Sequence, residues 1–138
     1  MTSDVQIPSA MPLYTDDDVV RVRAQVRQFA VEIGLSLVDQ TKVVTAASEL
    51  ARNTLRHAGG GEARLQILQR ENMRGLHLAF SDRGPGIADI GLAMTDGYTS
   101  GGGLGLGLGG AKRLVDEFEL TTEVGKGTTV VIIKWKRF

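Results

Sequence analysis

The first residues able to do chemistry are a carboxylate and an amide four positions apart, Glu49 and Asn53. On a helix, residues at this spacing lie on one face. A neutral amide oxygen is a suitable ligand for Mg²⁺, and a neighbouring carboxylate can orient an attacking hydroxyl or accept its proton. For this pair taken alone, the alternative interpretation is a solvated polar face of a helix.

A second candidate is the run from Ser81 to Ile87, in which Asp82, Gly84 and Gly86 follow an apolar strand pattern. A carboxylate can accept a hydrogen bond from an exocyclic amine such as that of adenine. Glycines lack a Cβ, so a flat base can lie against their backbone. An ordinary aspartate-glycine turn is the alternative.

The third candidate is a glycine-dense stretch that opens a predicted helix. Residues 105–110 match G-x-G-x-x-G, but a dinucleotide-binding loop requires a strand directly before it, and here a polar, glycine-rich segment precedes. A Walker A loop is also excluded, because the only Gly-Lys pair lacks the upstream glycine spacing and a hydroxyl residue after the lysine. Free N–H groups and the positive end of a helix dipole would suit phosphates, whereas a disordered linker is the alternative. The residues of this candidate phosphate-covering segment are Gly101, Gly102, Gly103, Leu104, Gly105, Leu106 and Gly107.

The elements that must position these residues begin with two helices. Thr15 and Asp18 form a capping-box pattern, and apolar residues then recur at helical spacing as far as Ile33. A second helix is predicted from about Ser36 to about His57, where three glycines follow. This second helix carries the carboxylate and amide pair.

After the second helix the pattern changes from helical to alternating. Residues 63–67 and 76–80 alternate apolar and polar side chains around a turn, which predicts a β-hairpin that ends at Asp82. The remaining predicted elements are a short helix near 90–94 in an irregular segment, a helix over about 108–118, a closing hairpin of 120–124 and 128–135, and an edge strand at 5–7.

Length and composition favour one folded domain over residues 1–138, with 42% hydrophobic and 23% charged residues. Sixteen basic residues balance sixteen acidic ones, so nucleic acid is not expected as a partner. The chain has no cysteine and two histidines, which excludes thiolate zinc sites and disfavours a multi-histidine metal site. No apolar run reaches membrane-spanning length and the N-terminus does not resemble a signal peptide, so a cytoplasmic location with no membrane partner is expected.

Taken in order, the three candidate segments resemble the N, G1 and G2 boxes of the GHKL (Bergerat-fold) ATPases, over about residues 36–136. Within that superfamily, Glu-Leu-Ala-Arg-Asn, Asp-Gly-Tyr-Thr-Ser-Gly-Gly-Gly and the Lys-Trp ending are similar to the anti-sigma-factor serine/threonine kinases, and most of all to their RsbT-like stressosome switch kinases. The resemblance implies an α+β fold, a two-layer α/β sandwich with a mixed, mostly antiparallel sheet and helices on one face.

The resemblance also implies a role for each candidate residue, with ATP and Mg²⁺ as cofactors. Asn53 would hold Mg²⁺ and contact the nucleotide, and Glu49 would be the catalytic base. Asp82 would bind the adenine amine, and Thr128 would support Asp82 or a bound water. Around them, the base pocket would be shaped by Gly84, Gly86 and Ile87, and the phosphates would be covered by a lid of Gly101–Gly107.

Other polar residues near these motifs are given no role in the chemistry. Arg52 and Arg56 are interpreted as helix-surface arginines, which are commoner than phosphate ligands. His57 is interpreted as a capping or packing residue near the end of its helix.

The function implied by the resemblance is a protein kinase that transfers the γ-phosphoryl of ATP to a serine or threonine of a STAS-domain antagonist, in a partner-switching stress or sigma-factor pathway. The alternative is a nucleotide-dependent binding switch that activates a PP2C-type phosphatase or sequesters a sigma factor, with little kinase activity. The ATPase domain of a sensor histidine kinase is less favoured, because a chain that begins at Met1 is expected to leave no room for a phosphoacceptor helix pair. The resemblance is also compatible with a homodimer.

Overall fold

The computed structural model describes residues 2–4, 9–95 and 107–136, which form ten elements. The predicted edge strand at 5–7 and most of the glycine stretch, 101–106, lie outside these described residues. In chain order the elements are β1 (Thr2–Asp4), β2 (Ser9–Leu13), α1 (Asp16–Glu32), α2 (Leu37–Ala58), β3 (Gly61–Arg70), β4 (Met73–Asp82), α3 (Ile90–Ala93), α4 (Gly107–Arg113), β5 (Glu117–Glu123) and β6 (Gly127–Trp135).

The two long helices begin where their capping residues predict. Thr15 accepts a hydrogen bond from the Asp18 N–H, and the Asp18 carboxylate accepts from the N–H groups of Tyr14 and Thr15, so the capping box is confirmed. The Tyr14 N–H is the main reason that the pKa of the Asp18 carboxyl lies below its usual value. Ser36 caps α2, and Gly59 ends it in the left-handed conformation with φ of 72°.

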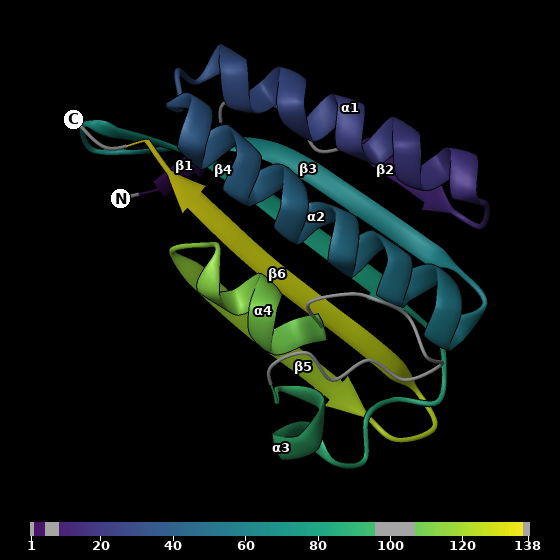
Figure 1. Cartoon of the computed structure of the whole chain (residues 1–138). Coiled ribbons are helices and arrows are strands. Elements are labelled where there is room, and N and C mark those ends of the chain that lie inside the picture. The colour runs from purple at the N-terminus through teal and green to yellow at the C-terminus, as the bar shows by residue number, and fades with distance from the viewer. Residues whose placement is uncertain (1, 5–8, 96–106, 137–138) are drawn as a thin grey trace.

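The sheet has the order β1-β3-β4-β6-β5, with β2 also paired to β3. Every described pairing is antiparallel, so the mixed part of the expected sheet has no counterpart among the described strands. Helices α1, α2 and α4 cover one face of this sheet (Figure 1). The α+β class and the two-layer arrangement are therefore confirmed.

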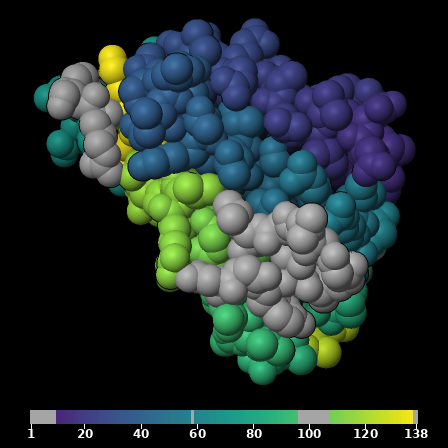
Figure 2. All heavy atoms as spheres, viewed as in Figure 1, coloured from purple at the N-terminus to yellow at the C-terminus, as the bar shows by residue number. Residues whose placement is uncertain are grey.

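The core lies between these helices and the sheet. Helix α2 contacts α1 on one side, α4 on the other, and strands β3, β4 and β6 beneath. Its middle is almost fully buried, and alanines there let the helix lie close to the sheet. In the space-filling view, α1 and α2 form a continuous purple-to-blue layer (Figure 2). The core residues that α2 and the hairpin β3–β4 contribute are Val43, Val44, Ala46, Ala47, Leu50, Ala51, Ala63, Leu65, Ile67, Leu76, Leu78 and Phe80.

The helix predicted over about 108–118 is wrong at its end, because α4 stops at Arg113 and β5 begins at Glu117. Alternate residues of β5 are half-buried and the strand pairs along its whole length with β6. At the corner, the Asp116 carboxylate accepts the N–H of Trp135 at 2.7 Å. Strand pairing therefore overrides the helical spacing of the apolar residues.

A buried ion cluster fixes the same corner to the start of α2. Lys134 of β6 is only 5% exposed, and its Nζ lies 3.5 Å from Asp39 and 3.8 Å from Asp116. A buried ammonium needs such partners, because desolvation of an unpaired charge is costly. The cluster connects α2, β6 and the α4–β5 corner. Within the residues that the structure describes, no helix is long and apolar enough to cross a bilayer.

Candidate functional site

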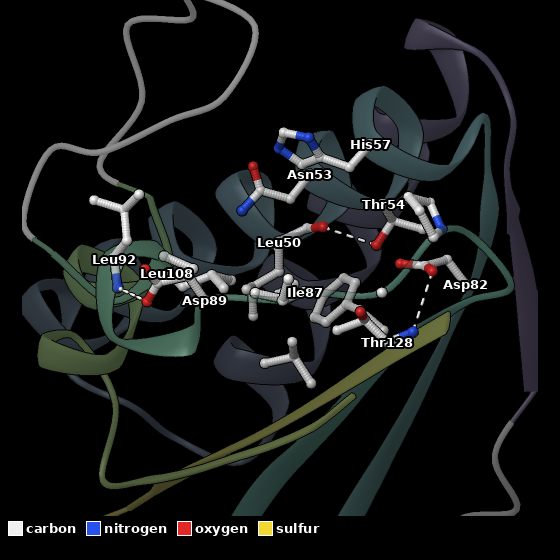
Figure 3. Close-up of a pocket in the computed structure, with 16 residues that line it drawn as sticks. Leu50, Asn53, Thr54, His57, Asp82, Ile87, Asp89, Leu92, Leu108 and Thr128 are labelled. Carbon is white, nitrogen blue, oxygen red and sulfur yellow. Dashed lines mark hydrogen bonds between the residues drawn. The ribbon is translucent and has the colours of Figure 1, made fainter. Parts of the chain in front are cut away.

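A cavity of about 300 Å³ lies between the C-terminal half of α2, the ends of β4 and β6, and the segment that follows β4. Asp82 and Thr128 lie at one end of it, Asp89 and Leu92 at the other, with Leu50 and Ile87 between them (Figure 3). The lining residues are Leu50, Asn53, Thr54, His57, Phe80, Asp82, Pro85, Gly86, Ile87, Ala88, Asp89, Leu92, Ala93, Leu108, Thr128 and Val130. The cavity thus has an apolar base with polar groups at defined points, as small-molecule sites do.

The aspartate end of the cavity, defined by Asp82 and Thr128, is held by backbone hydrogen bonds. Asp82 Oδ1 accepts the N–H of Gly84 at 2.9 Å and the N–H of Thr128 at 3.2 Å. Its other carboxylate oxygen makes no hydrogen bond within the described part of the chain. One oxygen is therefore used to fix the side chain, and the other can accept a donor from a ligand.

The loop after Asp82 is locked against the β5–β6 turn. The Gly125 N–H donates to the Pro85 carbonyl at 2.8 Å. Gly86 has φ of +78°, and a Cβ on it would lie 2.5 Å from the Glu123 carbonyl oxygen. At this approach no side chain fits, so the backbone packing itself requires this glycine.

Gly127 at the start of β6 is constrained in the same way. Its φ is +130°, and a Cβ on it would lie 2.2 Å from the Asp82 carbonyl oxygen. The close approach brings the first residues of β6 against Asp82. It thereby positions the Thr128 N–H to donate to the carboxylate.

Helix α2 supplies the other predicted residues. Asn53 is half-buried and lines the cavity, and its side-chain amide makes no hydrogen bond to any described residue. Glu49 lies one turn earlier and is 7% exposed, with Oε1 3.2 Å from Nη1 of Arg52. Glu49 is not among the cavity-lining residues. The structure therefore brings Asn53, Asp82, Gly86, Ile87 and Thr128 around one cavity and leaves Glu49 beside it.

Gly84 contributes through its backbone N–H and does not itself line the cavity. Of the candidate phosphate-covering segment, 101–107, only Gly107 is described: it is buried, has φ of +71° and begins α4. The next residue, Leu108, lines the cavity. The predicted lid residues Gly101, Gly102, Gly103, Leu104, Gly105 and Leu106 lie outside the described part of the chain.

Among the described residues, no group of three or more histidine, cysteine, aspartate or glutamate side chains could hold a metal ion. A cation at this site would therefore take most of its ligands from a bound nucleotide and from water. Asn53 offers a neutral amide oxygen on the cavity wall, which suits a cation that keeps waters and phosphate oxygens as its other ligands.

Residues 14–134 match the histidine kinase-like ATPase domain. The chain belongs to the histidine kinase-like ATPase family. As a member of an ATPase family it uses ATP.

Two curated relatives align over most of their length. The serine/threonine-protein kinase RsbT of Bacillus subtilis is 43% identical over 129 residues, which cover 94% of this chain and 97% of the relative. An anti-sigma F factor of Clostridium kluyveri is 32% identical over 118 residues, covering 81% of this chain and 82% of the relative. The described residues thus form a histidine kinase-like ATPase fold related in sequence to anti-sigma-factor kinases.

Solved structures agree on the fold. A Mycobacterium tuberculosis protein containing RsbU and RsbW domains superposes with a TM-score of 0.64 at 22% identity, covering 94% of this chain and 32% of that chain. The mycobacterial sensor histidine kinase MprB gives a TM-score of 0.54 at 22% identity and covers 96% of this chain and 99% of that chain.

Two polar residues near the cavity were not given a role by the sequence. His57 lines the cavity one turn after Asn53, and this spacing of four was the signal that could have placed it there. Thr122 of β5 contacts Ile87 and Thr128 through hydrogen bonds, although it is not a lining residue. No local motif marks Thr122, because its partners are on other elements.

Proposed function

We propose that this protein is a serine/threonine protein kinase that transfers the γ-phosphoryl of Mg-ATP to a STAS-domain antagonist in a partner-switching pathway. The observation that carries the proposal is the 43% identity to a serine/threonine-protein kinase across nearly the full length of both chains. The cavity that joins Asn53 of α2 to Asp82 of β4 supports it, because these residues come from separate predicted motifs.

The adenine base would occupy the apolar part of the cavity, with its exocyclic amine toward Asp82. Support comes from the fixed side chain, whose second carboxylate oxygen is open to a donor. Ile87 and Leu50 lie between the two ends and provide apolar surface for the ring faces (Figure 3). Gly86 lines the cavity without a side chain of its own.

Mg²⁺ would be held by the Asn53 amide oxygen together with phosphate oxygens and waters. The uncommitted amide on the cavity wall fits this role, since a single neutral protein ligand is enough for a cation bound mainly by phosphates. When bound, the ion neutralises charge on the phosphates. The proposed lid, Gly101 to Gly107, would cover the phosphates from the other side.

Glu49 would act as the catalytic base. In the transfer, the bond between the γ-phosphorus and the bridging oxygen of ADP breaks, and a bond from the acceptor hydroxyl oxygen to phosphorus forms. The hydroxyl proton passes to the Glu49 carboxylate. Arg52 Nη1 lies 3.2 Å from that carboxylate and would position it, although the sequence favoured a surface arginine.

A second role is favoured by the name of several relatives, anti-sigma F factor. The protein would then also act by docking, as a nucleotide-dependent switch that binds a sigma factor or a PP2C-type phosphatase. We further propose that residues 1–138 work as one domain in the cytoplasm, with a homodimer as the assembly to test by light scattering.

The experiment that tests the kinase proposal is transfer of radiolabel from γ-labelled Mg-ATP to purified STAS-domain proteins. Labelling of a serine or threonine on one of them is the expected result. Binding of ATP without transfer to any of them, together with ATP-dependent capture of a sigma factor or phosphatase, would favour the docking role instead.

A further inference from the structure

Thr122 lies on β5, one step behind the cavity wall, and its hydroxyl has three polar neighbours. The Ile87 N–H donates to Thr122 Oγ1 at 2.9 Å. The Gly127 carbonyl oxygen lies 3.2 Å from the same hydroxyl, and Thr128 Oγ1 lies 2.9 Å from it. The segment after β4 and the start of β6 therefore meet at one oxygen of β5.

One assignment of the hydrogens makes all three contacts hydrogen bonds. A hydroxyl has one hydrogen to donate and two lone pairs to accept with. A carbonyl oxygen can only accept, so the single hydrogen of Thr122 goes to Gly127. The two lone pairs then take the Ile87 N–H and the Thr128 hydroxyl hydrogen. In this arrangement every group in the network is satisfied.

This arrangement determines what the Thr128 hydroxyl, which lines the cavity beside Asp82, can offer to a ligand. With its own hydrogen donated to Thr122, Thr128 Oγ1 offers only lone pairs to the cavity. The open carboxylate oxygen of Asp82 is also an acceptor. Both polar groups at the aspartate end thus accept hydrogen bonds, and a ligand atom or water there has to donate.

We propose that Thr122 is a positioning residue that orients the Thr128 hydroxyl and so makes the aspartate end select a 6-amino purine over a 6-oxo purine. The inference rests on the proposed use of ATP at this site. Without the Thr122 oxygen, the Thr128 hydroxyl is free to turn its hydrogen into the cavity, where it can donate to a 6-oxo group. The Ile87 N–H also loses its acceptor.

The test compares the affinities of ATP and inosine triphosphate, which carries an oxygen in place of the 6-amino group, by titration calorimetry of the full chain. We expect Thr122→Val to lower the preference for ATP about tenfold relative to wild type, which corresponds to ~1.4 kcal/mol. Thr122→Ser keeps the hydroxyl and should keep the preference. Thr121→Val, on the exposed face of the same strand, is the matched control and should behave as wild type.

The outcomes separate this inference from the proposed function. Wild type that fails to bind ATP would contradict the proposed function itself. The inference alone would be overturned if wild type prefers ATP and the Thr122→Val variant keeps that preference. The same holds if the variant binds both nucleotides more weakly by the same factor. If circular dichroism shows that Thr122→Val is unfolded, Thr122→Ala takes its place. The quantity compared is still the ratio of the ATP affinity to the inosine triphosphate affinity, which does not depend on an overall loss of affinity.

Discussion

The aspartate end of the cavity and the α2 face that carries Glu49 and Asn53 differ in how completely they are built. At the aspartate end, Asp82 accepts two backbone N–H bonds, and Thr122 ties Ile87 to Thr128. On the α2 face, Asn53 makes no hydrogen bond to a described residue, and Glu49 is held by Arg52. In the first region the side chains are fixed by hydrogen bonds within the protein and one Asp82 oxygen stays open to a ligand, whereas in the second the whole side-chain amide of Asn53 is open.

Under the proposed function, this difference would separate the part of the site that recognises the base from the part that transfers the phosphoryl group. Preorganised groups bind a ligand without the cost of ordering, which suits the part of a site that recognises an invariant base. Groups that act on phosphates need freedom to accept a cation, and a base must reach an acceptor hydroxyl that a partner protein brings. Substitutions confined to one region at a time test the two roles separately.

The largest effect is expected from Gly127→Ala, because a Cβ there would lie 2.2 Å from the Asp82 carbonyl oxygen at φ of +130°. We expect a loss of about 3 kcal/mol in the free energy of unfolding, measured by urea denaturation, from combined backbone strain and steric clash. Gly125→Ala is the matched control: its φ is +84° with nothing within 4 Å, so dihedral strain alone should cost about 1 kcal/mol. Equal losses would show that the contact with Asp82 does not constrain the turn.

The next effect is expected from Asp82→Asn, in which the amide oxygen keeps the backbone N–H bonds and the amide NH₂ faces the cavity. A donor would then face the adenine amine, so ATP affinity should fall roughly thirtyfold, from ~2 kcal/mol of lost charged hydrogen bonding. The control is Asp89→Asn at the other end, where the side chain caps α3 and asparagine caps equally well. An Asp82→Asn variant that binds ATP as tightly as Asp89→Asn would place the base elsewhere.

A smaller effect is expected from Asn53→Ala, which removes the proposed protein ligand of Mg²⁺. ATP affinity measured with Mg²⁺ should fall about tenfold, or ~1.4 kcal/mol, while affinity measured in EDTA should match that of wild type. Comparing the affinity in Mg²⁺ with the affinity in EDTA separates the contribution of metal binding from that of adenine recognition. An equal loss in both would mean that Asn53 contacts the nucleotide directly.

The sequence predicted the elements whose signals are local. The caps at Thr15 and Ser36, the hairpin that ends at Asp82 and the helix that presents Asn53 are all confirmed. Such features are set by neighbouring residues, so a single sequence contains them. The three motifs also indicated the family before the fold was known, because their order on helix, strand and helix restricts the choice strongly.

What the sequence did not predict depends on contacts between distant segments. The end of α4 was missed because strand pairing of Phe118 with Ile132, fourteen positions on, decides it. The role of Thr122 was missed because its hydroxyl meets Ile87, which is 35 positions away. Glu49 and Arg52 are only three positions apart, so their ion pair is local. An arginine three positions after a glutamate is common on helix surfaces, however, and does not by itself indicate a role.

The central claim, a site that recognises the base at Asp82 and transfers phosphate at Glu49, is tested most directly by Glu49→Gln. ATP affinity and radiolabel transfer to the antagonist would be measured on the same preparation, beside wild type. The account predicts ATP affinity within about twofold of wild type and transfer reduced by at least about a hundredfold, because the amide cannot take the hydroxyl proton. Transfer at the native rate would contradict the account.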